Sequence, residues 1–85
     1  MDAKEIFGRN VCRERKAAGM SQEHLAFKAG LARSYMSDVE RGRRNPTVEV
    51  IGRIAAALSV PAGVLVEGIP EMLGAGRPNA PRNDP

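Results

Sequence analysis

Apolar side chains recur at helical spacing over residues 4–67, with polar residues between them. The first such stretch covers residues 4–18 and ends at Gly19. A second begins after Ser21, whose hydroxyl is placed to cap a helix, and ends at Gly30. A third covers residues 33–41 and ends at Gly42, a residue that readily takes the left-handed conformation that closes a helix. The pattern therefore predicts three short helices in the first half of the chain.

Two further helices are predicted downstream. Thr47 is placed to cap a helix at residues 48–58, and a brief helix at 61–67 is favoured because Pro61 suits a first helical position. No strand pattern competes, so the sequence predicts an all-α fold of five helices in a single domain, residues 1–73. Residues 74–85 are rich in Gly and Pro and are predicted to form a disordered tail. Its two arginines either add loose phosphate contacts or serve only to keep the terminus soluble.

The predicted helix at residues 33–41 has two different faces. At about 100° per residue, Met36 and Val39 point in one direction, toward a core, with Tyr35 on the flank. A continuous polar arc faces the other way, and its members are Arg33, Ser34, Ser37, Asp38 and Arg41. Side chains of this kind read base edges in DNA. Because only a tight turn separates this helix from the one at residues 22–29, the two form a helix-turn-helix, whose second helix fits the major groove.

The charge of the chain suits an anionic partner without requiring one. Thirteen Lys and Arg oppose ten Asp and Glu, giving a formal net charge of +3. Ten of the basic residues are arginines, whose planar guanidinium matches phosphates and base edges better than lysine does; a codon bias toward arginine is the plainer explanation. The position of the arginines is therefore more informative than their number.

Size and composition disfavour several other classes. A chain of 85 residues buries only roughly 60% of its unfolded surface and leaves no room for a deep substrate cavity, which favours a binding module over an enzyme. Cys12 is the only cysteine and His24 the only histidine, so we expect no disulfide, no structural metal and no cofactor. Neither a leader peptide nor an apolar run of about 18 residues occurs, which indicates a cytoplasmic protein.

The stretch "GMSQEHLAFKAGLARSYMSDVERGRRNPT" resembles the Xre or lambda-repressor-like (Cro/C1-type) helix-turn-helix family. The shared pattern includes Ser-Gln, Leu-Ala, a turn glycine, Glu-x-Gly and Pro-Thr, and the resemblance covers residues 5 to about 67. The shorter stretch "RSYMSDVERGRRNPT" is also similar to the controller proteins of restriction-modification systems. This resemblance implies a compact lambda-repressor-like domain that regulates transcription by binding double-stranded DNA.

The resemblance also implies roles for particular residues. Base edges would be read by Arg33, Ser34, Ser37 and Asp38. Phosphates would be bound by Gln22, Tyr35, Arg41, Arg43, Arg44 and Asn45. Three alternatives stay open: a phosphate contact for Arg33, an ion pair with Arg41 for Asp38, and packing of the ring on the core for Tyr35.

Other positions are expected to stabilise the fold. Gln22 would also brace the start of the 33–41 helix, unless it is an ordinary surface residue. Arg15 and Glu40 occupy positions at which the family has an ion pair, so both are assigned to structure rather than to DNA contact. Two positions depart from the family pattern. Ala32 replaces a capping Ser or Thr worth about 1 kcal/mol, and His24 replaces the Glu or Gln of a capping box.

One helix in the groove touches few base pairs, so we expect a homodimer on a two-fold DNA site, with half-sites about 34 Å apart. The candidate contact residues are Val60, Val64, Val66, Ile69, Met72 and Leu73. Alternatively, these residues close over the core of the monomer, as Leu65 is expected to do. A second functional hypothesis is an antitoxin or bridging protein that acts mainly through a protein partner. An enzyme is the weakest hypothesis, because the sequence contains no recognisable nucleophile and base pair.

Overall fold

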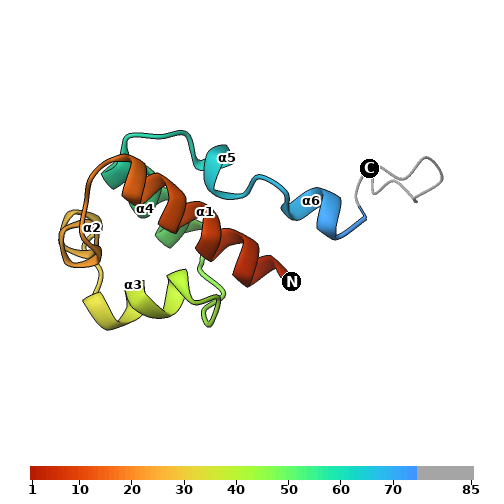
Figure 1. The fold of residues 1–85 in the computed structure, drawn as a ribbon, viewed down its shortest axis with the longest axis horizontal. Coiled ribbons are helices and arrows are strands. Elements are labelled where there is room, and N and C mark those ends of the chain that lie inside the picture. Colours follow the sequence, from red (N-terminus) through yellow and green to blue (C-terminus); the bar gives the residue numbers. More distant parts are fainter. Residues whose placement is uncertain (75–85) are drawn as a thin grey trace.

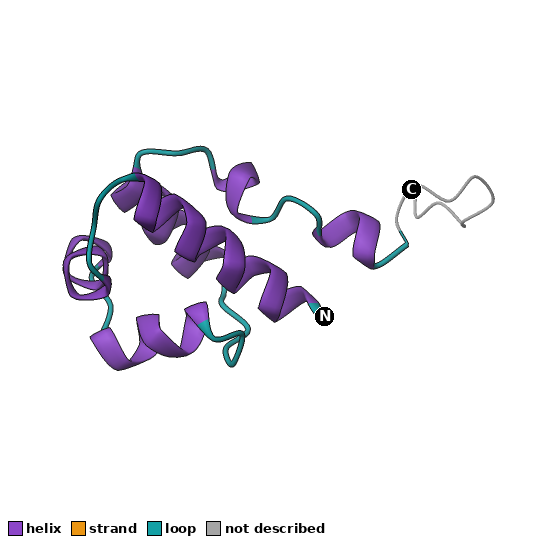
Figure 2. Cartoon of the chain, viewed as in Figure 1, coloured by secondary structure: helices purple, strands orange, loops and turns teal. Residues whose placement is uncertain are grey.

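The computed structural model describes residues 1–74, and the regular secondary structure of that part of the chain is entirely helical (Figure 2). The helices are α1 (Ala3–Ala17), α2 (Gln22–Ala29), α3 (Arg33–Glu40), α4 (Val48–Leu58), α5 (Ala62–Leu65) and α6 (Ile69–Met72). The prediction of an all-α fold is confirmed, and the first four helices lie within one residue of their predicted bounds. The tail predicted for residues 74–85 falls outside the described residues, except for Gly74.

Helix α1 is the centre of the fold and contacts α3, α4, α5 and α6 (Figure 1). Helices α2 and α3 lie at one end of the molecule, and α5 and α6 lie on the side of α1 away from α3. The core draws on the first five helices, and its fully buried larger side chains are Val11, Leu25, Met36, Val39, Ile54 and Leu65. A single small core therefore joins the helix-turn-helix to the rest of the domain.

Side-chain caps explain where three of the helices begin. The backbone N–H of His24 donates to the Ser21 hydroxyl at 3.0 Å, and that of Val50 donates to Thr47 at 3.2 Å, as the sequence predicted. Helix α1 has a full capping box that we did not anticipate, in which Asp2 and Glu5 each accept a hydrogen bond from the other's backbone N–H. The spacing of an acid followed three residues later by Glu is the signal that identifies such a box.

The C-terminal end differs from the prediction of one helix at residues 61–67. Helix α5 stops at Leu65, and a second short helix, α6, follows. The reason is the buried side chain of Asn10, whose Nδ2 donates to the carbonyl oxygens of Leu65 and Glu67, both at 2.9 Å. Gly68 then takes a left-handed conformation, with φ of 89°, and redirects the chain into α6. A long-range contact from α1 therefore decides how α5 ends.

Helices α1 and α3 approach closely at Gly8. A Cβ atom at this position would collide with the carbonyl oxygen of Val39 and would lie 3.0 Å from that of Glu40. Both obstacles are backbone atoms, which cannot rotate away as a side chain can. The absence of a side chain at Gly8 therefore sets the distance between α1 and the end of α3.

We expect Gly8→Ala to lower the free energy of unfolding by about 1–3 kcal/mol, since α1 and α3 must separate to admit the methyl group. Gly52→Ala is the matched control, because Gly52 is an exposed helical residue with open space around its Cα. That change should raise stability by up to about 1 kcal/mol through helix propensity alone. Urea unfolding, monitored by circular dichroism, measures the free energy of unfolding of both variants. Equal stabilisation by the two substitutions would contradict the close approach.

Candidate nucleic-acid interface

A tight turn joins α2 to α3. Gly30 adopts φ of 70°, and its N–H reaches the Phe27 carbonyl at 3.2 Å. The N–H of Leu31 then donates to the carbonyl of Ala26 at 2.9 Å, while the Leu31 side chain packs against the core. These bonds use the carbonyl groups that the end of α2 leaves free, so the turn holds α3 at a fixed angle to α2.

The two faces of α3 are arranged as the helical pattern predicts. Met36 and Val39 are completely buried, with 0% exposure, and hold one side of α3 in the core. Arg33 and Ser34 are exposed, and Ser37 and Asp38 are half-buried. Ala32 precedes the helix without a side-chain cap, as expected. Packing of the apolar face, rather than a cap, therefore holds the start of α3.

The segment after α3 presents a group of exposed polar residues. It is closed by Gly42, which has φ of 74° and packs so closely on α1 that a Cβ would lie 2.7 Å from Cγ of Glu5. The exposed residues around it are Arg41, Arg43, Arg44 and Asn45. Since Gly42 is fixed against α1, these side chains project from an anchored turn. We call this group, together with the outward residues of α3, the basic face.

Within the described part of the chain, the three arginines of this turn differ in their partners. No ion pair there involves Arg41 or Arg43, whereas Nε of Arg44 lies 3.3 Å from Oδ2 of Asp38. The Arg44 guanidinium also lies 5.3 Å from the centre of the Tyr35 ring, a cation–π contact. The structure thus pairs Asp38 with Arg44 and not with Arg41. Tyr35 is half-buried and packs against the core, in keeping with the alternative left open for it.

Glu40, the last residue of α3, is the meeting point of three helices. Arg15 of α1 donates to it from Nε at 2.6 Å and from Nη2 at 2.9 Å, and Nε2 of Gln22 donates to it at 3.0 Å. The Glu40 side chain is only 5% exposed and that of Arg15 12%. Arg15 also donates to the carbonyl of Met20, just before α2. We call these three residues the Glu40 node.

The position of Gln22 corrects one expectation. Its side-chain amide donates to Glu40, at the end of α3, and not to the start of that helix as the family resemblance implied. The reason is that the amide finds in Glu40 a carboxylate that is buried and needs donors. Gln22 is half-buried in the first turn of α2, so it still lies at the helix terminus where a phosphate is favoured.

Burial raises the pKa of Glu40, but hydrogen bonds from Arg15 and Gln22 outweigh that effect and hold its pKa below the usual value. The same pairing raises the pKa of Arg15. Both members of the pair are therefore charged at neutral pH. Cys12 is half-buried beside them, with its Sγ 3.7 Å from Nη2 of Arg15.

Comparison with known proteins agrees with this geometry. A helix-turn-helix family profile matches residues 13–65, more than half of the chain. The chain belongs to this helix-turn-helix family. It is therefore a DNA-binding regulator of the Xre or Cro/C1-like type, as the sequence predicted.

Several relatives share both the sequence and the fold. The control protein C.SmaI of Serratia marcescens is 42% identical over 71 residues, covering 81% of this chain and 84% of that protein. An HTH-type transcriptional regulator of Sinorhizobium fredii, y4dJ, is 42% identical over 60 residues, or 71% and 78% of the two chains. The crystal structure of the restriction-modification controller protein C.AhdI from Aeromonas hydrophila superimposes with a TM-score of 0.72 at 44% identity, over 73% of this chain and 94% of that one.

Among residues 1–74, no helix combines the length and the apolar character needed to cross a membrane.

We expect Glu40→Gln to lower the free energy of unfolding by about 3 kcal/mol at neutral pH, because the substitution leaves the Arg15 charge buried and unpaired. Since folding lowers the pKa of Glu40, its stabilising effect is present above the unfolded value of about 4.3. That effect is lost as the pH falls through the folded pKa. The difference between wild type and variant should therefore shrink on acidification.

Urea unfolding at a series of pH values measures this difference. Glu49→Gln is the control, since Glu49 pairs with Arg53 at 2.8 Å but is 73% exposed. Its effect should stay below about 0.5 kcal/mol at every pH. A difference for Glu40→Gln that does not change with pH would contradict the assignment of a charged Glu40 node.

Proposed function

We propose that the chain is a sequence-specific transcriptional regulator that binds double-stranded DNA as a homodimer, with α3 in the major groove. The observation that carries this proposal is the division of α3, whose apolar side is completely buried while its polar side is open and continues into a turn of arginines. On this polar side Arg33 and Ser34 are exposed, and Ser37 and Asp38 are half-buried. Its dimensions and its donors and acceptors suit base edges.

In this proposal, the residues of the basic face have two kinds of task. Arg33, Ser34, Ser37 and Asp38 read bases from the outward side of α3. The phosphate contacts come from Gln22, Tyr35, Arg41, Arg43, Arg44 and Asn45. The Glu40 node holds α3 against α1 and α2 while these contacts are made.

Substitution of single arginines tests this division. Arg33→Ala should weaken binding by about 1–3 kcal/mol and relax the preference at one base pair of a duplex selected from a random pool. Arg43→Ala should weaken binding to all duplexes alike. Three turn arginines per subunit give about six phosphate contacts per dimer, so log K should fall against log salt with a slope of about −5. A slope near zero, or equal sequence-independent losses in both variants, would refute the proposal.

The homodimer is proposed to form at the end of the molecule where α6 lies against α1. Of the six predicted contact residues, Val60, Val66 and Ile69 pack against the core of the monomer, and Leu65 is buried as expected. Met72 and Leu73 are exposed, by 37% and 65%. The exposed pair therefore supports the contact best, whereas Val64 is half-buried in α5.

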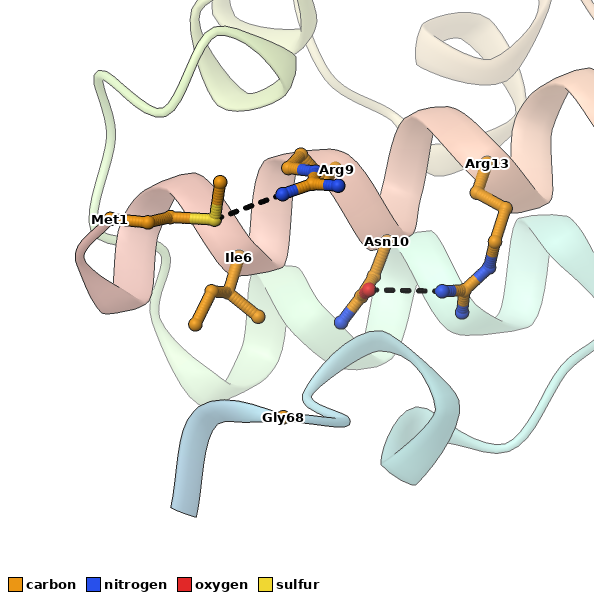
Figure 3. A pocket seen from close by; sticks show the side chains of 6 residues that line it. All are labelled: Met1, Ile6, Arg9, Asn10, Arg13 and Gly68. Atoms are coloured by element: carbon orange, nitrogen blue, oxygen red, sulfur yellow. Dashed lines mark hydrogen bonds between the residues drawn. The ribbon is translucent and has the colours of Figure 1, made fainter. Parts of the chain in front are cut away.

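A hollow of about 530 Å³ next to Gly68, the residue before α6, supports a contact of this pair with a second copy (Figure 3). Met1 and Ile6 supply its apolar surface, and Arg9, Asn10 and Arg13 line it along α1. A second α6 would bring Met72 and Leu73 to the apolar part and the Glu71 carboxylate toward the arginines. Such a contact is self-complementary, as a two-fold dimer requires.

Replacement of Met72 and Leu73 together by Asp should convert the protein to a folded monomer, because charges would enter the apolar contact. Sedimentation equilibrium measures the mass, and circular dichroism shows whether the fold persists. Phe27→Asp is the control, since Phe27 is 84% exposed on α2, away from α6, and should leave the mass unchanged. A dimer that survives the double substitution would contradict the proposed contact.

A second candidate function is a bridging protein or antitoxin whose partner binds the same exposed residues of α6. Met72 and Leu73 favour it as much as they favour a second copy. A wild type that is monomeric by sedimentation, yet forms a stoichiometric, salt-resistant complex with a purified protein, would support this alternative over the homodimer.

A further inference from the structure

The arginine turn folds back over α3 and carries one of its arginines with it. The N–H of Arg43 donates to the backbone carbonyl of Asp38 at 2.9 Å, which closes the end of α3 and reverses the chain at Gly42. The next residue, Arg44, then places its guanidinium between the Asp38 carboxylate and the Tyr35 ring. Tyr35 and Asp38 are one helical turn apart, so together they form a seat for this guanidinium.

This seat gives the basic face an internal competitor for phosphate. A carboxylate and a phosphate present the same kind of acceptor to a guanidinium. The Arg44 side chain is 52% exposed and that of Asp38 30%, so solvent weakens their attraction and the pair can open when another anion arrives. Arg41 and Arg43 have no such pair within residues 1–74, so opening it is a cost specific to Arg44.

We infer that Asp38 is a specificity-determining residue that occupies Arg44 in the free protein and releases it fully only on the correct DNA sequence. This inference rests on the proposed function. On an arbitrary duplex, a phosphate must compete with Asp38 for Arg44, and the released carboxylate faces the DNA without a partner. On the correct site, a cytosine amino group donates to Asp38. Arg44 then exchanges Asp38 for a phosphate, and Asp38 exchanges Arg44 for the cytosine. The cost of separating the pair is therefore offset.

The exchange predicts opposite effects of Asp38→Asn on two kinds of DNA. Affinity for a duplex of random sequence should rise by about two- to five-fold, since Arg44 is no longer held. Affinity for the duplex selected by the wild type should fall by about five-fold or more, because the amide lacks the second acceptor and charge of the carboxylate. The ratio of the two affinities should therefore fall by at least about ten-fold. Fluorescence anisotropy with labelled duplexes measures all these affinities.

Two controls separate the exchange from a general effect of charge. Glu67→Gln removes one negative charge from a similar surface pair, with Arg13 at 3.5 Å. Glu67 belongs to the segment between α5 and α6, and these helices lie on the side of α1 away from α3 (Figure 1). It should change both affinities by less than about two-fold. In an Arg44→Ala background, Asp38→Asn should change the affinity for the random duplex by no more than Glu67→Gln does.

Each remaining outcome decides the inference. Weaker binding of Asp38→Asn to the random duplex would overturn it, since Asp38 would then orient Arg44 toward phosphate. If Asp38→Asn still binds the random duplex more tightly in the Arg44→Ala background, the inference is wrong, and repulsion between the Asp38 carboxylate and DNA explains the effect. If the wild type binds DNA with a steep salt dependence but Asp38→Asn behaves as Glu67→Gln does, only this inference fails. If the wild type binds no duplex, the proposed function fails with it.

Discussion

The position of α3 depends on one buried carboxylate. Glu40 is almost without solvent contact and must receive its hydrogen bonds from the protein, because an unsatisfied buried charge is strongly destabilising. Arg15 and Gln22 supply them, from α1 and from the first turn of α2. A helix held only by apolar packing is free to slide or rotate by small amounts. Hydrogen bonds of fixed length from α1 and α2 restrict this movement. The close approach of Gly8 to the backbone carbonyls of Val39 and Glu40 restricts it further.

The outward side of α3 is defined by this inward attachment. Met36 and Val39 fill the core and Glu40 is engaged at the helix end, which leaves Arg33 and Ser34 exposed and Ser37 and Asp38 half-buried on the other side. Rigid placement matters for base recognition, because hydrogen bonds to base edges demand accurate donor positions. The Glu40 node thus supports the short helix that carries the outward residues of the basic face. Ala32 lacks a cap without consequence for this arrangement, since the buried side of α3 already fixes its start.

The sequence predicts those features that local chemistry determines. Ser21, Thr47, Gly30 and Gly42 mark helix ends through their own hydrogen bonds or backbone conformation, and each does so in the structure. The buried side of α3 follows equally from helical periodicity, because Met36 and Val39 are one turn apart. The roles assigned to individual side chains on DNA remain predictions.

Features that depend on the folding back of a loop are missed. For Asp38 the sequence left open an ion pair with Arg41, its neighbour on a helix surface, but α3 ends at Glu40 and the turn at Gly42 brings Arg44 to Asp38 instead. Helix α5 ends early because Asn10, more than fifty residues away in the sequence, donates to the carbonyl of its last residue, Leu65, and to that of Glu67 beyond it. Spacing along a chain carries no information on either contact. Both arise after the helices have packed, which is why periodicity and capping rules fail at these two places.

Helix α1 contacts both α3, which carries part of the basic face, and α6, where the homodimer contact is proposed. Gly8 and Arg15 face α3, whereas Ile6 and Asn10 face the segment that leads into α6. The fifteen residues of α1 span about 22 Å as one uninterrupted helix. Two reading helices must lie about one turn of DNA, roughly 34 Å, apart to enter successive major grooves. In a dimer formed through α6, that distance is set by the two copies of α1 and the angle between them. A change at the α6 contact would therefore alter the spacing of the reading helices even if every residue of the basic face stayed in place.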